Sequence, residues 1–551
     1  MWYNRGNIQA FNFLSKMIKK PFFFNQISSS SLIIITASFL TAFTNVAFFS
    51  NIVAIYPLNL KNIGFLVSLP WFFGGLTLLL FALICHKYTI KPVIITILII
   101  SSFSAYFMDS YNTIIDDSMI RNIVDTDVAE ALDLLSIRQL LYFVFLGVLP
   151  AFLVYRVDIV YRSGWSEFAA RIKLIVLTLV GMSVLVFILS DFYTSFFREH
   201  KSLRFYANPV YYLYSSGKFI HGQYQSQSAS LQQIGLDAKI PASDIHRELI
   251  IFVVGETVRA DRFSLNGYSR ETNPLLKQET LLSLSNFWSC GTSTAVSVPC
   301  MFSIYNSSEF DIEKGRSTEN VLDVLDRAGV NLLWLDNNSS SKGVADRIPY
   351  ESYRSPDVNS ECDIECRDIG MLRKLQSYIS EHPTGDIFIV LHQMGNHGPA
   401  YYKRYPPEFE RFTPACKTNQ LEDCSVEAIN NAYDNAILYT DYFLSQVIEL
   451  LKRNNESFET GMFYVSDHGE SLGESGFYLH GLPNFIAPDS QRHVPAILWL
   501  GESYGDADYD LLHSKRNQRY THDNIFHTIL GFMEIESSVY DKDLDIIHAD
   551  D

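Results

Sequence analysis

Basic residues are scarce in this chain of 551 residues. It contains 43 Lys and Arg against 60 Asp and Glu, and its formal net charge at pH 7 is −17. Because proteins that bind nucleic acid present a basic face to the phosphates, this balance argues against a nucleic-acid partner. No internal repeat is visible along the chain.

Charged residues are also rare in long stretches of the first 195 residues, whereas the chain beyond about residue 240 has the composition of an acidic globular domain. A transmembrane helix needs about 20 apolar residues. Five stretches meet or approach that length: 31–50, 63–85, 92–108, 139–155 and 173–195. The first could be a cleaved signal peptide, but no small-residue cleavage site follows it and further spans do. We therefore expect an α-helical membrane domain, residues 1–195, with five transmembrane helices.

Lys and Arg are unevenly distributed between the loops that join these spans. Residues 1–30 carry four basic residues and no acid, and the links 86–91 and 156–173 are also basic. The loops on the other side have few basic residues, and the loop 109–138 is strongly acidic. Since basic loops stay in the cytoplasm, we expect a cytoplasmic N-terminus and, after five crossings, a large C-terminal domain outside.

Cysteine is rare as well, and the spacing of the seven cysteines lacks the repeated CxxC of a thiolate zinc site. Cys85 lies at the expected cytoplasmic face. The other six form close pairs in the exported part: Cys290 and Cys300, Cys362 and Cys366, Cys416 and Cys424. Close pairs in an oxidising compartment are typical of disulfides. Pairing each cysteine with its neighbour is the simplest of several possible connectivities.

Residues 196–245 mix aromatic with basic and polar residues, which favours a connector along the membrane surface over a plain linker. From residue 246 to residue 551, short apolar runs alternate with segments of helical periodicity. The expected strands are 248–256, 330–336, 386–395, 461–467 and 494–500. Such alternation predicts an α/β domain with a mostly parallel sheet.

Reactive side chains follow three of these predicted strands. Glu256 ends the first, His397 follows the third, and Asp467 and His468 end the fourth. Ligands bind at the carboxyl edge of such sheets, and carboxylates with imidazole suit zinc or a similar divalent metal. Each residue alone also has a structural explanation, such as a turn or a hydrogen-bonded loop histidine. For His392, within the third strand, the structural explanation is the better one.

Four hydroxyl side chains lie in the stretch SCGTSTAVSVPC, between Cys290 and Cys300: Thr292, Ser293, Thr294 and Ser297. A Ser or Thr hydroxyl is a poor nucleophile at neutral pH but becomes alkoxide-like on a metal. A helix that begins near Ser293 would also favour a phosphate at this place. The loop can therefore supply a nucleophile, although the spacing alone does not choose among the hydroxyls.

Seven parts of the sequence resemble the lipid A phosphoethanolamine transferases, a family of the alkaline phosphatase/sulfatase superfamily that includes the mobile colistin-resistance enzymes. They are VVGETVRADRFSLNGY (253–268), SCGTSTAVSVPCMFS (289–303), DNNSSSKG (336–343), ECRDIGML (365–372), HQMGNHGPAYYKRY (392–405), NAYDNA (431–436) and YVSDHGESLGE with YLHG (464–481). The resemblance covers essentially the whole chain, including the five spans, and implies an alkaline-phosphatase/sulfatase-like fold for the exported domain.

The resemblance implies one firmly bound zinc ion and allows a second in some states. The implied zinc ligands are Glu256, Thr294, Asp467 and His468. Thr294 is the implied nucleophile, which carries the phosphoethanolamine. The implied phosphate pocket, with both catalytic and substrate-binding roles, consists of Lys342, His397 and His480. The family's three disulfides match the three neighbouring pairs of cysteines.

The acidic loop 109–138 gains a role from the same resemblance. Asn122, Thr126 and Glu130 are spaced by four residues, so on a helix they would share one face. They match positions that hold the donor headgroup, where a carboxylate suits the ethanolamine ammonium; without the resemblance, a plain polar face is the better interpretation. The chain departs from some relatives after its last disulfide, where CSVEA has Val426 in the region of a histidine. If that histidine helps to bind the acceptor elsewhere, this protein binds it differently.

The resemblance implies a monomeric, multi-pass protein of the Gram-negative inner membrane with a periplasmic catalytic domain. It would transfer phosphoethanolamine from phosphatidylethanolamine to a lipid A phosphate through a phosphothreonine, lowering surface negative charge and giving resistance to polymyxins such as colistin. The alternatives are transfer to Kdo or heptose of the lipopolysaccharide core, a phosphoglycerol transferase, or a non-catalytic scaffold. A sulfatase is disfavoured, because no Arg follows Thr294 at the spacing that formylglycine formation needs.

Overall fold

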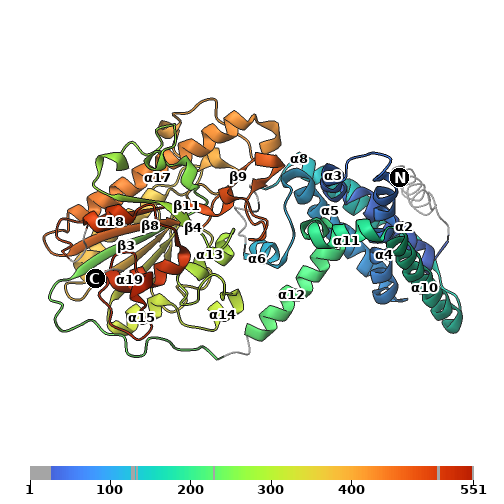
Figure 1. The fold of residues 1–551 in the computed structure, drawn as a ribbon, viewed down its shortest axis with the longest axis horizontal. Coiled ribbons are helices and arrows are strands. Elements are labelled where there is room, and N and C mark those ends of the chain that lie inside the picture. The colour runs from blue at the N-terminus through green and yellow to red at the C-terminus, as the bar shows by residue number, and fades with distance from the viewer. Residues whose placement is uncertain (1–25, 126–130, 132–133, 227–229, 506–508, 549–551) are drawn as a thin grey trace, which may run out of the picture. The chain divides into compact units, whose positions relative to one another are not determined.

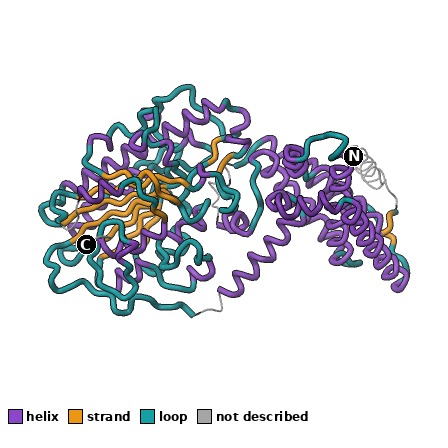
Figure 2. Tube along the Cα trace, viewed as in Figure 1, coloured by secondary structure: helices purple, strands orange, loops and turns teal. Residues whose placement is uncertain are grey.

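The computed structural model describes the chain apart from residues 1–25, 126–130, 132–133, 227–229, 506–508 and 549–551 (Figure 1). The chain divides into two compact units. One comprises Met1–Ile115 and Ser136–Ser215 and is largely helical where it is described; the other comprises Asp116–Leu135 and Ser216–Asp551 and contains a large sheet (Figure 2). Part of the acidic loop 109–138 therefore groups with the second unit.

Within the described residues, the first unit has four helical stretches long and apolar enough to cross a membrane: α4 (Ile63–Ile84), α5 (Ile90–Tyr111), Ile137–Arg156 and α10 (Gly164–Ile188). The stretch Ile137–Arg156 consists of α8 (Ile137–Tyr142), a π-helical segment (Phe143–Val148) and α9 (Leu149–Arg156). A bent pair, α2 (Ser29–Phe43) and α3 (Val46–Ile55), makes a fifth span if it is counted as one. The five predicted spans correspond to these elements.

The predicted limits of the last span, 173–195, were wrong. The helix α10 begins at Gly164 and ends at Ile188, because no helix breaker occurs in WSEFAARIK. Arg171 lies inside this helix, where its guanidinium donates to the backbone carbonyls of Ala82 and Cys85 at the end of α4. The charged residues that suggested a loop are thus accommodated within the helix. The predicted connector 196–245 contains the end of α11 (Ser190–Glu199) and all of α12 (Val210–Ser226).

The first span bends by 56° between α2 and α3. Asn45 lies at the break, and its side-chain amide donates to Leu40 O at 3.0 Å and to Asn208 O at 2.8 Å. The Asn208 backbone N–H donates in return to Asn45 Oδ1 at 2.9 Å. Broken helices are tolerated in membrane proteins where neighbouring groups satisfy the freed backbone. The Asn45–Asn208 pair meets that requirement here.

The sheet of the second unit has eight strands in the order β12-β4-β11-β8-β3-β7-β5-β6. Their bounds are β3 (Glu248–Gly255), β4 (Leu282–Trp288), β5 (Asn331–Asp336), β6 (Tyr350–Ser352), β7 (Ile387–His392), β8 (Glu459–Ser466), β11 (His493–Leu500) and β12 (Tyr520–Thr521). A separate two-stranded sheet contains β9 (Ser471–Leu472) and β10 (Tyr478–Leu479).

The predicted α/β architecture is confirmed, and all five predicted strands are present as β3, β5, β7, β8 and β11. The part β8-β3-β7-β5-β6 is parallel, whereas β11 runs antiparallel to both of its neighbours. The strand β4 was not predicted, because the prediction rested on continuous apolar runs; its sequence, LSLSNFW, instead begins with the polar–apolar alternation of a half-buried strand.

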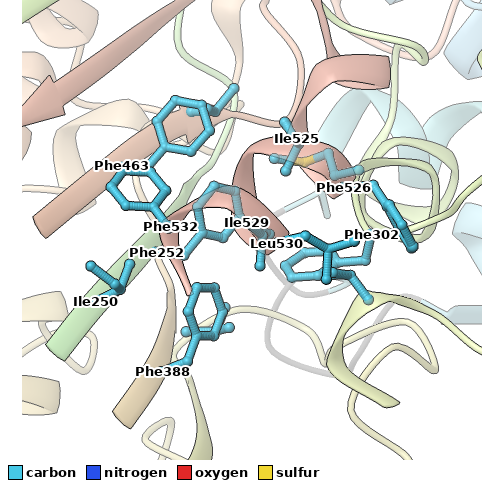
Figure 3. Close-up of a cluster of buried hydrophobic side chains, with 14 of the residues drawn as sticks. Ile250, Phe252, Phe302, Phe388, Phe463, Ile525, Phe526, Ile529, Leu530 and Phe532 are labelled. Atoms are coloured by element: carbon cyan, nitrogen blue, oxygen red, sulfur yellow. The ribbon is translucent and has the colours of Figure 1, made fainter. Parts of the chain in front are cut away.

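The two faces of the sheet are covered by different helices (Figure 1). Along β3, Leu249, Ile251 and Val253 pack in the cluster that includes α17 (Val426–Lys452). The alternate side chains of β3 belong to the cluster that includes α15 (Val321–Ala328) and α19 (Ile525–Phe532). Figure 3 shows Ile250 and Phe252 of β3 with side chains of α19. Every residue of β3 is buried, as expected of a central strand covered on both faces. The remaining helices of this unit are α6 (Asp117–Asp125), α13 (Thr294–Met301), α14 (Ile312–Arg316), α16 (Leu375–Glu381) and α18 (Tyr509–Lys515).

Gly255 leaves no space for a larger residue at the end of β3. A Cβ at this position would lie 2.5 Å from Cε2 of Tyr464, whose ring is fully buried. We expect Gly255→Ala to destabilise the full-length protein by about 1–3 kcal/mol through overpacking. The measurement is the thermal unfolding midpoint of the purified protein in detergent.

The matched control for this variant is Gly217→Ala, because Gly217 lies in α12 with nothing within 4 Å of its Cβ position. It should leave the midpoint unchanged or raise it slightly, since Ala favours helix over Gly. Adding Tyr464→Leu to Gly255→Ala should cost less than the sum of the single effects. Simple additivity of the two would contradict the proposed steric conflict.

Candidate active site

The carboxyl ends of β3 and β8 bring three predicted metal ligands together. Glu256 directly follows β3, and Asp467 and His468 directly follow β8; all three are fully buried. One ligand atom from each lies within 4.8 Å of the others. Thr294 is the first residue of α13, and its Oγ1 lies 3.0 Å from Glu256 Oε2 and 3.3 Å from His468 Nε2.

Backbone N–H groups directly after β3 and β8 orient the Asp467 carboxylate. Thr257 has φ of +60°, a left-handed conformation that is uncommon for a β-branched residue and characteristic of functional sites. Its N–H donates to Asp467 Oδ1 at 3.1 Å, and the N–H of His468 donates to the same oxygen at 2.7 Å. Asp467 Oδ2 is buried and accepts no hydrogen bond. That oxygen is therefore available to a cation.

Burial sets the protonation of the site. His468 Nδ1 lies 2.9 Å from Gly469 O, so Nδ1 carries the proton and Nε2 presents its lone pair toward Thr294. Burial is also the main reason that the pKa of His468 is lowered to about 3. Burial and the facing Glu256 carboxylate raise the pKa of Asp467 well above its usual range. A bound cation would remove that unfavourable interaction between the carboxylates.

The donor set fits a divalent metal. It combines carboxylate oxygens, a neutral imidazole nitrogen and a hydroxyl, which are ligands typical of a catalytic zinc site or of a related divalent metal. The buried, unbonded Asp467 Oδ2 and the lone pair of His468 Nε2 both belong to this cluster. The residues predicted from the sequence as metal ligands therefore form one compact, water-excluded cluster.

Two of the predicted phosphate-pocket residues, His480 and His397, lie beside this cluster. The His480 ring lies 4.4 Å from the His468 ring and 5.7 Å from the His397 ring, measured between centroids. Glu470 orients His480 through a contact of 3.2 Å between its Oε1 and His480 Nδ1. Lys342 is almost fully buried, and its Nζ donates to Ser339 Oγ at 2.7 Å.

Two cavities adjoin these side chains. One of about 360 Å³ is lined by Lys342, Arg316 and Arg347 among others. The other, of about 420 Å³, is lined by His397 together with Arg354, Lys403 and other residues. Both have room for polar groups, and both include cationic side chains suited to phosphate.

The headgroup residues predicted in the acidic loop can be followed only in part. Asn122 lies on α6, which packs against α13. Its Nδ2 is 3.9 Å from the position that a Cβ on Gly481 would occupy, so Asn122 lies next to the residue that follows His480. Thr126 and Glu130 lie outside the described residues.

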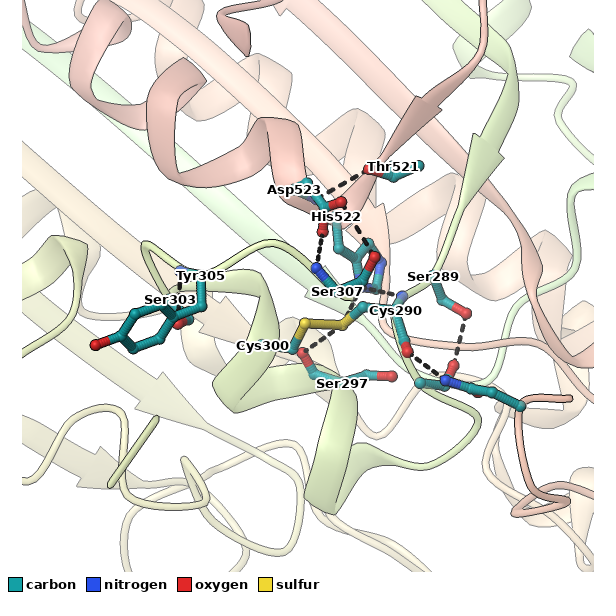
Figure 4. Close-up of a disulfide and its surroundings, with 12 residues drawn as sticks. Ser289, Cys290, Ser297, Cys300, Ser303, Tyr305, Ser307, Thr521, His522 and Asp523 are labelled. Carbon is teal, nitrogen blue, oxygen red and sulfur yellow. Dashed lines mark hydrogen bonds between the residues drawn. A yellow bond between two sulfur atoms is a disulfide. The ribbon is translucent and has the colours of Figure 1, made fainter. Parts of the chain in front are cut away.

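The loop that carries Thr294 is closed by the disulfide Cys290–Cys300 (Figure 4). The backbone N–H of Cys290 donates to His522 Nδ1 at 3.3 Å, and His522 Nε2 lies 3.1 Å from Ser466 O at the end of β8. His522 therefore links the hydroxyl loop to the strand that bears the metal ligands. The other two bridges, Cys362–Cys366 and Cys416–Cys424, also join the neighbouring cysteines.

Several residues of this site did not stand out in the sequence. Asn338 is buried, and its Nδ2 donates to Glu256 Oε2 at 2.7 Å and to Gln393 O at 2.8 Å. Asn338 and Glu470 occur inside the family motifs DNNSSSKG and YVSDHGESLGE, which is the signal that could have identified them. His522 lies in none of these motifs. His392 is structural, as expected: its Nδ1 lies 3.0 Å from Asp336 Oδ2 within the sheet.

Comparisons with known proteins confirm the resemblance. Residues 74–224 match the family model "Phosphoethanolamine transferase EptA/EptB", and residues 248–535 match the model "Sulfatase". The chain is 43% identical to phosphatidylethanolamine transferase Mcr-1 of Escherichia coli, over 92% of this chain and 95% of that protein. It is 36% identical to phosphoethanolamine transferase EptA of Escherichia coli K12, over 97% and 99%.

Solved structures of phosphoethanolamine transferases also resemble this chain. The fold matches the integral membrane protein lipooligosaccharide phosphoethanolamine transferase A of Neisseria meningitidis with a TM-score of 0.91 and 34% identity, over 95% of this chain and 99% of that one. The C-terminal periplasmic domain of the phosphoethanolamine transferase EptC of Campylobacter jejuni is 42% identical, over 57% of this chain and 97% of that one, with a TM-score of 0.50.

Asn338 provides a test of how the site is held. We expect Asn338→Ala to weaken metal binding by about 10–100-fold, because it removes the amide that holds the Glu256 carboxylate in place. The metal retained by the purified full-length protein, measured by elemental analysis after dialysis against graded chelator concentrations, gives this value. Asn331→Ala is the matched control: its amide also donates two hydrogen bonds, but both go to backbone carbonyls at the opposite end of the sheet. Equal metal retention by both variants would refute the assigned role.

Proposed function

Because this chain belongs to the EptA/EptB family of phosphoethanolamine transferases, with a C-terminal region of the sulfatase family, we propose that it moves phosphoethanolamine from phosphatidylethanolamine to a phosphate of lipid A through a phosphothreonine at Thr294. One observation carries this proposal: the Thr294 hydroxyl lies within hydrogen-bond distance of both Glu256 and His468 in a buried metal-ligand cluster. The names of relatives support the substrate class: they include a phosphatidylethanolamine transferase and Kdo(2)-lipid A phosphoethanolamine 7''-transferases.

Thr294 is favoured over the neighbouring hydroxyls by its contacts. The Ser293 hydroxyl is buried and has no hydrogen-bond partner, and the Thr292 hydroxyl donates to Leu482 O at 2.7 Å. Thr294 is also at the N-terminus of α13, where backbone N–H groups and the helix dipole favour a phosphoryl group. The N-terminus of α13 thus carries the proposed nucleophile and also favours binding of the phosphoryl group.

The proposed metal is zinc, held by Glu256, Asp467, His468 and Thr294. When bound, it would favour the alkoxide form of the threonine and offset the charge of the phosphoryl oxygens. Asn338 and Thr257 fix the Glu256 carboxylate through hydrogen bonds to its two oxygens. The backbone N–H groups of Thr257 and His468 hold Asp467 Oδ1 and leave Oδ2 for the cation.

In the first half-reaction, Thr294 Oγ1 forms a bond to the phosphorus of phosphatidylethanolamine, and its hydroxyl proton leaves along the hydrogen bond to Glu256 Oε2. The bond from phosphorus to the diacylglycerol oxygen breaks, and that oxygen takes a proton from a neighbouring histidine. His480 suits this task because Glu470 holds its Nδ1, which leaves Nε2 to face the substrate. Lys342 and His397 are placed to stabilise negative charge on the transferring group.

In the second half-reaction, a phosphate oxygen of lipid A attacks the phosphothreonine. The phosphorus–oxygen bond to Thr294 breaks, and the released oxygen regains its proton along the hydrogen bond to Glu256, which restores the hydroxyl for the next turnover. The cavity that contains His397, Arg354 and Lys403 supplies cationic groups for an anionic acceptor. Asn122, with Thr126 and Glu130 of the same loop, is assigned to the ethanolamine end of the donor.

Orientation and physiological effect complete the proposal. The domain bounds expected from the sequence, 1–195, 196–245 and 246–551, are retained here, with a cytoplasmic N-terminus and a periplasmic catalytic domain in the inner membrane, and the protein acts as a monomer. Each added ammonium reduces the negative charge of the outer surface. Because cationic peptides bind that surface by charge, the expected result is resistance to polymyxins such as colistin.

The decisive variant is Thr294→Ala in the full-length protein, expressed in a Gram-negative host that lacks its own lipid A phosphoethanolamine transferase. We expect the phosphoethanolamine increment on lipid A, seen with the wild type, to fall by at least about 10³-fold, because the covalent route is lost. Mass spectrometry of extracted lipid A measures this outcome.

The matched control is Ser293→Ala, which removes an adjacent hydroxyl that has no hydrogen-bond partner. It should retain transfer. Continued transfer by Thr294→Ala would overturn the assignment of the nucleophile. Unmodified lipid A with well-expressed wild type would overturn the acceptor, and phosphoethanolamine on the Kdo or heptose of the core would identify the alternative.

A further inference from the structure

A second cluster of carboxylates lies at the opposite end of the sheet from the active site. Glu248 and Glu459 begin β3 and β8, and Asp386 directly precedes β7. Asp244 and Glu534 approach from neighbouring segments. Two groups of three ligand oxygens, Asp244–Glu248–Asp386 and Glu248–Glu459–Glu534, each lie within 4.8 Å of one another and share Glu248.

Glu248 is the unusual member of this cluster. Its side chain is fully buried, and neither carboxylate oxygen accepts a hydrogen bond from an N–H or hydroxyl group. A buried carboxylate without a partner is strongly unfavourable. Burial and the carboxylates of Asp386 and Asp244 raise the pKa of Glu248 to about 10. The local chemistry thus calls for a positive charge at this point.

The nearby cationic side chains do not supply that charge to Glu248. Arg247 donates through Nε to Gly385 O at 2.9 Å and through Nη2 to His382 O at 3.0 Å, and its guanidinium lies 4.3 Å from the centre of the Phe458 ring. The His246 side chain is 62% exposed and contacts Glu459 Oε1 at 3.1 Å. Both therefore have partners other than Glu248.

We infer that this cluster binds a hard divalent cation, of which Ca²⁺ is the best match, with Glu248 as the shared central ligand. All available donors are carboxylate oxygens, the ligands that Ca²⁺ prefers, whereas zinc favours nitrogen and sulfur. Ca²⁺–oxygen distances of about 2.3–2.6 Å allow ligand oxygens up to about 5 Å apart. The observed limit of 4.8 Å within each group meets this requirement.

This site is separate from the proposed zinc site. Glu248 and Glu256 are at the two ends of β3, roughly 26 Å apart at about 3.3 Å per residue. A cation at Glu248 would link the amino ends of β3, β7 and β8, which are neighbouring parallel strands at the centre of the sheet. The cation would stabilise the sheet at its amino edge. The ion would come from the periplasm, the compartment proposed above for this domain.

The test measures Ca²⁺ binding to the full-length protein in detergent, after chelation and dialysis. Titration calorimetry with CaCl₂ and the thermal unfolding midpoint are the two readouts. The wild type should bind one Ca²⁺ per chain at this site and show a higher midpoint with Ca²⁺ than without it. Glu248→Gln should weaken this binding by at least about tenfold and abolish the Ca²⁺-dependent rise, because it removes the shared ligand charge.

Controls separate this inference from loss of folding and from the active site. Without Ca²⁺, Glu248→Gln should unfold no earlier than the wild type, since it removes a buried carboxylate that lacks a partner; Asp386→Asn should show the same loss of Ca²⁺ response. Glu256→Gln, at the active site, and Glu427→Gln, on the surface, should keep the response.

Two results would overturn the inference. One is a wild type whose midpoint and heat signal are insensitive to Ca²⁺, which would mean that Glu248 and Asp386 share a proton instead. The other is a Ca²⁺ response that persists in Glu248→Gln but disappears in Glu256→Gln, which would place the ion at the active site. Neither readout depends on transferase activity.

Discussion

The burial of two facing carboxylates, Glu256 and Asp467, is the constraint on which the catalytic unit depends. Like charges in a water-excluded site are costly unless each oxygen is hydrogen-bonded or bound to a cation. The chain meets this cost with backbone N–H groups at the ends of β3 and β8 and with the amide of Asn338. One Asp467 oxygen is left without a hydrogen bond, and this open position suits the cluster to a cation.

The proposed nucleophile, Thr294, is distinguished from its neighbours by the structure of its loop. The loop between Cys290 and Cys300 offers several hydroxyls, but the start of α13 directs only that of Thr294 to Glu256 and His468. The disulfide and His522 hold this loop against the end of β8 (Figure 4). Positioning matters because in-line attack on phosphorus depends on distance and direction more than on intrinsic reactivity.

The same parallel strands have acidic clusters at both ends, and their chemistry differs. At the carboxyl edge, carboxylates combine with imidazole and hydroxyl groups, a mixture suited to a catalytic metal. At the amino edge, carboxylates alone surround Glu248. A central strand that is apolar along its length and acidic at both ends, as β3 is, connects the two clusters through a rigid core. Its stability therefore bears on the geometry of the active site.

The sequence by itself determined the membrane and α/β classes, because hydrophobic runs and buried strands depend on local composition. Through family motifs it also proposed Glu256, Thr294, Asp467 and His468 as site residues, and the structure brings these side chains together. The limits of the last membrane helix, the antiparallel course of β11 and the roles of Asn338, His522 and Glu248 were decided only by the tertiary structure. Their partners are far away in the chain, and the hydrogen bonds and charges that define them exist only after the strands have come together. Hydrophobic periodicity predicts which face of a segment is buried, but it does not predict which residues that face contacts.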